Sequence, residues 1–194
     1  MSEVVLFHHA LGLTPGVGEF ADELRRDGHV VHTPDLFAGR VFADIDSGVA
    51  YVDEMGFDVF TECGVESVDG LSSEVVYAGF SLGVLPAQRL AQTRPRARGA
   101  LLFEACIPVT QFGTGWPEGV PVQVHGMEDD AFFAGEGDID AARALVAEAG
   151  GNTRAELFIY PGDKHLFADT SLGSYSADAT TLMTSRVLAF LGDL

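Results

Sequence analysis

A serine flanked by glycines is the segment of the chain best suited to catalysis. Gly79-Phe80-Ser81-Leu82-Gly83 follows the apolar run Val75–Ala78 and precedes a segment of helical periodicity that ends near Thr93. A sharp turn between a strand and a helix pushes a hydroxyl out of the sheet, and crowding at such a turn favours glycine two residues before and after it. The first N–H groups of the helix point to the same place and can stabilise an oxyanion. We therefore predict that Ser81 is a nucleophile and that the Leu82 N–H is an oxyanion donor, in preference to an ordinary glycine turn.

A serine hydroxyl needs a base, and the base needs a carboxylate that orients it. His165 follows the apolar run Leu157–Tyr160 and is the predicted base. The only other histidine C-terminal to Ser81 is His125, which ends a strand and is expected to hold its loop by a hydrogen bond.

The acid is expected after an earlier strand than the base. Asp129 follows the apolar run Val120–Val124 and is the predicted acid, with Glu128 and Asp130 left as alternatives. The second oxyanion donor is expected from the loop after the first strand, and its position favours the backbone N–H of Ala10.

Short apolar runs alternate with segments of helical periodicity along the chain. The runs are apolar throughout rather than at every second residue, which indicates strands buried on both faces. Helices between them indicate a mostly parallel sheet flanked by helices on both faces, an α/β fold, and no linker or repeat divides residues 1–194, so we expect a single domain. The expected strands are Val4–Phe7, Val30–Val31, Val75–Ala78, Ala100–Phe103, Val120–Val124 and Leu157–Tyr160. Helices are expected from Thr14-Pro15 to Gly28, after Ser81, from Asp138 to Gly150 and over 179–191, whereas residues 43–62 show helical periodicity without clear ends.

Composition excludes several classes of function. The net charge of −18 disfavours nucleic acid and anionic membranes as partners. The two cysteines form no disulfide framework, and the N-terminus does not resemble a signal peptide, so a cytoplasmic protein is expected. His8, His9, His29 and His32, with Asp35, match no zinc-ligand spacing, so no metal site is predicted. The absence of a phosphate-binding fingerprint argues against a nucleotide-binding protein.

These motifs, in this order, resemble those of the dienelactone hydrolase family, an α/β-hydrolase branch without a cap domain. The resemblance covers nearly the whole chain and includes the first-strand loop, Pro34–Phe37, Gly79–Gly83, Gly126–Asp129 and His165–Ala168. It implies hydrolysis of a small ester or lactone through an acyl-enzyme intermediate, without a cofactor. A thioesterase and a non-catalytic ligand-binding member of the same fold remain as alternatives, and the sequence leaves a homodimer open.

Three positions depart from the best-known members of that family. Ser81 replaces a cysteine, His9 replaces a glutamate that controls the thiol, and Asp169 replaces an arginine that holds the substrate's carboxylate. An aspartate there would repel an anion, so we expect a neutral ester, lactone or thioester. Side chains in loops after strands are expected to line the substrate pocket; those selected are His9, Trp116, Phe133 and Phe167.

Overall fold

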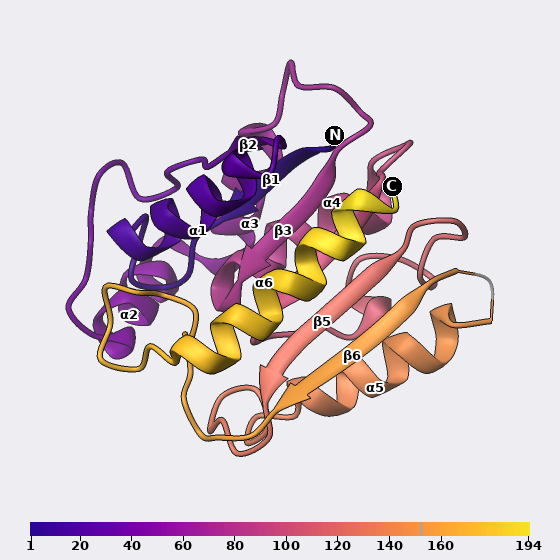
Figure 1. The fold of residues 1–194 in the computed structure, drawn as a ribbon. Helices are drawn as coiled ribbons and strands as arrows, with labels where there is room; N and C mark the ends of the chain where they lie inside the picture. The colour runs from indigo at the N-terminus through magenta and orange to yellow at the C-terminus, as the bar shows by residue number, and fades with distance from the viewer. Residues whose placement is uncertain (152) are drawn as a thin grey trace.

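The fold is built around a six-stranded parallel sheet with helices on both faces (Figure 1). The structure is a computed structural model that describes residues 1–151 and 153–194. The strands are β1 (Glu3–Phe7), β2 (Val30–His32), β3 (Val76–Phe80), β4 (Gly99–Phe103), β5 (Val122–Met127) and β6 (Ala155–Tyr160). The α-helices are α1 (Pro15–Arg26), α2 (Ile45–Met55), α3 (Phe57–Glu66), α4 (Val84–Thr93), α5 (Asp138–Ala149) and α6 (Ala177–Gly192).

All neighbouring strands pair in parallel, in the order β2-β1-β3-β4-β5-β6. Phe80 of β3 is paired with Phe103 of β4, and Met127 of β5 with Tyr160 of β6. The residues that follow these strands therefore emerge at one edge of the sheet, which is where ligands bind in open α/β folds. The prediction of a parallel α/β sheet without a separate cap is confirmed for the described residues.

The alternation of side chains along each strand divides the core into two layers. Val4 and Leu6 pack with α1 and α6 on one face, whereas Val5 and Phe7 belong to the layer that contains α4 and α5 on the other. Figure 1 shows α1 and α6 together in front of the sheet, with α4 behind it. Both faces are apolar, which is why the strands have continuous apolar runs. No helix among the described residues is long and apolar enough to cross a membrane.

Two segments differ from the sequence prediction. Residues 43–62 lie in two helices, α2 and α3, which meet at Gly56 with a φ of 97°. Strand β5 continues to Met127, three residues beyond the predicted end at Val124, because pairing with β6 extends that far. The turn after β5 therefore begins later in the chain than its hydrophobic pattern indicates.

The turn after β3 has the strained geometry that its glycines suggested. Ser81 has a φ of 48°, in the left-handed region that non-glycine residues rarely adopt. A Cβ on Gly79 would lie 2.2 Å from the Gly83 carbonyl oxygen, and one on Gly83 would lie 2.6 Å from the carbonyl oxygens of Phe7 and His8. The two glycines thus allow the turn to close on itself and against β1.

We expect Gly83→Ala to lower the free energy of unfolding by about 2 kcal/mol or more, because its methyl group would meet backbone oxygens that cannot move freely. The matched control is Gly18→Ala on α1, where a Cβ meets nothing within 4 Å and should be neutral or slightly stabilising. Urea denaturation of the three proteins measures the difference. Equal stability of both variants would contradict this account of the turn.

Candidate active site

Ser81 and His165, 84 residues apart in the chain, are in direct contact. The Ser81 hydroxyl donates to Nε2 of His165 at 2.8 Å. Ser81 comes from the turn after β3, and His165 from the loop after β6. The structure thus brings together the two residues predicted as nucleophile and base.

The carboxylate on the other side of the imidazole is Asp130. Nδ1 of His165 donates to Oδ2 of Asp130 at 2.7 Å, and the Phe132 N–H donates to Oδ1. Asp130 is fully buried, whereas Asp129 is exposed and contributes its backbone N–H to the Gly162 carbonyl.

The prediction of Asp129 is therefore corrected to Asp130, one of the alternatives left open. The reason is the longer β5: with the strand ending at Met127, the turn directs Asp129 to solvent and Asp130 under the sheet edge.

The contacts of His165 define its proton arrangement. A carboxylate only accepts hydrogen bonds, so Nδ1 carries the proton and Nε2 accepts from the serine. Burial lowers the pKa of His165, but the hydrogen bond to Asp130 and the charges of Glu104, Asp130 and Asp138 raise it more, so the pKa lies above 6.5.

Ser81 and His165 line an open cavity of about 670 Å³ beyond the carboxyl ends of the strands. Ala10 and Leu82, the predicted oxyanion residues, line the same cavity. One wall comes from α2 and the start of α3, and the other from the segments that follow β4 and β5. In Figure 1 α2 lies beyond the end of the sheet toward which the arrowheads of β5 and β6 point. The residues predicted as nucleophile and base therefore lie together at the wall of this cavity.

Glu104, which belongs to none of the sequence motifs described above, also lies at this cavity. It directly follows β4, next in register to Ser81, and its φ of 62° places it in the left-handed region as well. Oε1 accepts from the Phe167 N–H at 2.8 Å, whereas Oε2 is buried without a hydrogen-bond partner. Burial raises the pKa of Glu104 to about 7. Glu104 could have been predicted as a site residue because it is a carboxyl directly after the apolar strand Gly99–Phe103, where ligands bind in parallel α/β sheets.

The four residues predicted to bind substrate do not line this cavity. Phe133 and Phe167 are completely buried in the two core layers, and the indole N–H of Trp116 donates to the Val120 carbonyl. His9 is buried with Asp169. The prediction was wrong because the loops after the strands fold back over the core, and apolar aromatic rings in them are buried there.

Phe132, the neighbour of Phe133, is an aromatic residue that contacts His165. Its backbone N–H donates to Asp130, and its ring centroid lies 4.6 Å from that of His165. The side chain is half-buried and lines the cavity. It covers one side of the imidazole and shields the base from solvent.

The model of the Dienelactone hydrolase family matches residues 1–194, the whole chain. The chain belongs to this family. Membership supports hydrolysis of an ester bond as its class of activity. No curated protein sequence gives a significant match.

Solved structures show the same fold at low sequence identity. A dienelactone hydrolase-like promiscuous phosphotriesterase from metagenomic libraries is 20% identical, with a TM-score of 0.79 over 100% of this chain and 87% of the other. The dienelactone hydrolase of Anabaena variabilis is 15% identical, with a TM-score of 0.68 over 97% and 84%. An esterase from an Arctic intertidal metagenomic library is 14% identical, with a TM-score of 0.62 over 98% and 83%.

Two of the departures from better-known dienelactone hydrolases meet each other in this family member. Nε2 of His9 lies 2.9 Å from Oδ2 of Asp169, which also accepts from Thr14, while Ser171 binds the other oxygen. Burial alone would raise the pKa of Asp169, but these hydrogen bonds lower it to about 2. Asp169 does not line the Ser81 cavity. It ties the loops after β1 and β6 to the start of α1, so the structure gives Asp169 a structural role outside the cavity.

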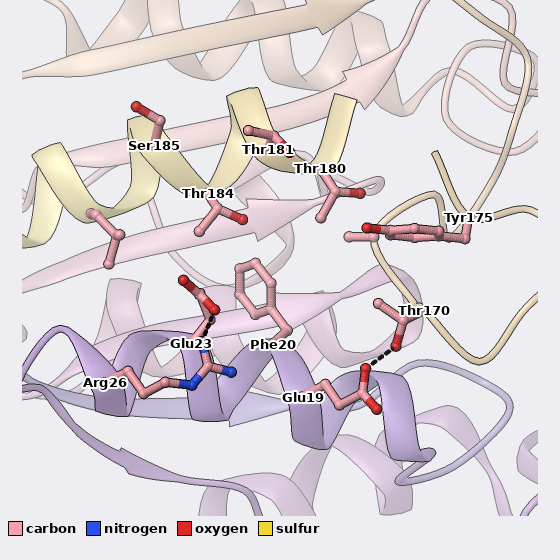
Figure 2. A pocket seen from close by; sticks show the side chains of 12 residues that line it. Glu19, Phe20, Glu23, Arg26, Thr170, Tyr175, Thr180, Thr181, Thr184 and Ser185 are labelled. Carbon is pink, nitrogen blue, oxygen red and sulfur yellow. Dashed lines mark hydrogen bonds and ion pairs between the residues drawn. The ribbon is translucent and has the colours of Figure 1, made fainter. Parts of the chain in front are cut away.

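A second cavity of this dienelactone hydrolase family member, of about 540 Å³, lies between α1 and α6 (Figure 2). Side chains of α6 with hydroxyl groups line it, but Thr180 and Thr181 donate to backbone carbonyls and Thr170 donates to Glu19. No histidine is among the described residues that line it, so it has no counterpart of the Ser81–His165 contact.

The histidines considered as metal ligands have other partners. Nδ1 of His29 accepts from the Ser2 N–H, Nε2 of His32 bonds Glu3, and Nε2 of His8 accepts from the Leu36 N–H. Within residues 1–151 and 153–194, no group of three or more histidine, cysteine, aspartate or glutamate side chains is placed to hold a metal ion.

We expect Glu104→Gln to stabilise this family member at pH 8 by roughly 3 kcal/mol and to change stability little at pH 5. The folded-state pKa of about 7 lies above the ordinary 4.5, so the wild-type protein loses stability as the pH rises from about 4.5 through 7. Chemical denaturation at the two pH values measures this, with the exposed Glu118→Gln as control. The same stability for Glu104→Gln and wild type at pH 8 would show that the buried carboxyl carries no such cost.

Proposed function

We propose that the protein is a serine hydrolase that cleaves a small ester or lactone through an acyl-enzyme intermediate. The observation that carries the proposal is the continuous pair of hydrogen bonds from Ser81 through His165 to the buried Asp130. Family membership and the strained turn at Ser81 add independent support.

In the acylation step, Ser81 Oγ attacks the carbonyl carbon of the ester while Nε2 of His165 takes its proton. Asp130 holds the imidazole with Nδ1 protonated and stabilises the positive charge that forms on the ring. The imidazolium then gives its proton to the leaving alcohol, and the serine ester remains. The 2.8 Å contact between Ser81 and His165 suits this transfer without a rearrangement of the base.

The negative charge on the former carbonyl oxygen needs donors in the same cavity. The backbone N–H groups of Leu82 and Ala10 are our candidates, because Leu82 follows the nucleophile and Ala10 lies in the loop after β1. In deacylation, His165 takes a proton from water as the water oxygen attacks the acyl carbon. The bond from that carbon to Ser81 Oγ then breaks, the imidazolium returns the proton to Oγ, and the carboxylic acid leaves. No cofactor takes part in these steps.

We expect Ser81→Ala to lower kcat/KM on an activated small ester by about 10⁴-fold, because the remaining site has no nucleophile. A fluorophosphonate probe should label the wild-type protein at Ser81 and leave Ser81→Ala unlabelled, since such probes require an activated serine. Ester, lactone and thioester panels measure the activity in parallel. A folded wild-type protein that neither reacts with the probe nor cleaves any ester would support the non-catalytic alternative.

Asp130→Asn should lower kcat/KM by about 10³- to 10⁴-fold, whereas Asp129→Asn should retain activity, because only Asp130 contacts the imidazole. In the wild-type protein, kcat/KM should rise with pH as His165 loses its proton, with an apparent pKa above 6.5. Removal of the Asp130 charge should move that limb to lower pH. The reverse ranking of the two variants would restore Asp129 as the acid.

A further inference from the structure

The cavity at Ser81 is lined by five carboxyl groups and by no lysine or arginine. The five residues are Asp46, Asp53, Glu104, Glu136 and Asp138. They lie on both walls, because Asp46 and Asp53 belong to α2 and the others follow β4 and β5. A concave surface with charge of one sign concentrates ligands of the opposite sign.

None of these carboxyls is balanced by an ion pair with a cationic side chain in the described part of the chain. The only lysine, Lys164, is adjacent to His165 in sequence but donates to the Tyr175 carbonyl. Oδ2 of Asp138 accepts from the Cys106 N–H, which satisfies a hydrogen bond but supplies no charge. The protein thus leaves the negative charge of the cavity unbalanced.

Glu104 adds an observation that is independent of the number of acidic residues. It is 1% exposed, and its Oε2 has no partner although the residue lines the cavity beside the reacting pair. Above its pKa of about 7 this carboxyl is charged and buried without an ion-pair partner, which is unfavourable, and so is the left-handed backbone that holds it there. A bound positive group would supply the missing charge.

The remaining walls fit an organic cation. Phe57 and Phe132 line the cavity, and the faces of aromatic rings attract ammonium groups. Ile45, Val49 and Leu85 offer apolar contacts for alkyl substituents. A metal ion is disfavoured, because among the described residues no three carboxyl, histidine or cysteine side chains are close enough to hold one.

We infer that the substrate is an ester that carries an ammonium group, primary or quaternary, held between the carboxyls and aromatic rings of the cavity during attack by Ser81. The inference rests on the proposed function for the attack itself, but binding of the cation does not. Hydrolysis releases a carboxylic acid and an alcohol, one of which retains the ammonium group.

The decisive comparison uses two esters of the same shape. Acetylcholine has a positively charged quaternary nitrogen where 3,3-dimethylbutyl acetate has a neutral quaternary carbon. The ratio of their kcat/KM values therefore isolates the effect of the charge. We expect acetylcholine to be preferred by about tenfold or more at low ionic strength, with the ratio falling as salt is added. A ratio of one, or a preference for the neutral ester, would overturn the inference.

Variants assign the preference to the cavity. Glu104→Gln should reduce the ratio severalfold, and the exposed pair Asp46→Asn/Asp53→Asn should reduce it further without any demand on core packing. Glu118→Gln, an exposed carboxyl that does not line the cavity, should leave the ratio unchanged. A ratio that no cavity variant alters would count against the assigned site.

Binding to Ser81→Ala separates failure of this inference from failure of the proposed function. Calorimetric titration should show choline bound about tenfold more tightly than 3,3-dimethylbutanol, whether or not the wild-type protein cleaves esters. Cation binding without any hydrolysis would refute the serine mechanism alone. Serine-dependent hydrolysis with equal binding of the two alcohols would refute the cationic substrate alone.

Discussion

His165 holds the site together, since its two ring nitrogens join a serine from one turn to a carboxylate from another. This is possible because β3, β5 and β6 run in parallel and end at one edge of the sheet. Three local features complete the site at that edge. Glycines let the Ser81 turn close, the turn after β5 carries Asp130 to the imidazole, and the ring of Phe132 lies against the imidazole. Most of the remaining residues form the two apolar layers that pack the sheet against the helices on its two faces.

The site contains several residues in unfavourable backbone conformations. Of the five non-glycine residues with positive φ in the described part of the chain, three lie after β3, β4 and β6 near His165, namely Ser81, Glu104 and Leu166; the other two are Ala38 and Arg96. Such conformations cost free energy and persist only where surrounding packing enforces them. Glu104 adds the cost of a buried carboxyl whose second oxygen has no partner. The concentration of strain and unbalanced charge at one edge of the sheet agrees with a surface organised around a ligand.

The structure gives His9 and Asp169 a different role from the one that the sequence suggests. Both residues are positions at which the chain departs from better-known dienelactone hydrolases. Read one at a time, His9 and Asp169 look like changes in the substrate pocket. In the structure they bind each other and fasten two loops to the N-cap of α1. The electrostatic character of the cavity comes instead from residues on α2 and after β4 and β5, which no single motif marks.

The parallel α/β layering could be predicted from the amino-acid sequence, because strands buried on both faces must be apolar throughout. Ser81 and His165 could also be predicted, because glycine spacing and a histidine after a strand are local signals. The sequence could not separate Asp129 from Asp130, since the end of β5 depends on pairing with β6 rather than on local hydrophobicity. Sequence alone also could not distinguish Phe132, which lines the cavity, from Phe133, which is buried in the core. Two adjacent phenylalanines in a loop do not differ in residue type or in local pattern. Only the packing of the folded chain places Phe132 at the cavity and buries the Glu104 carboxyl in its wall, because burial depends on what the rest of the chain places around a residue.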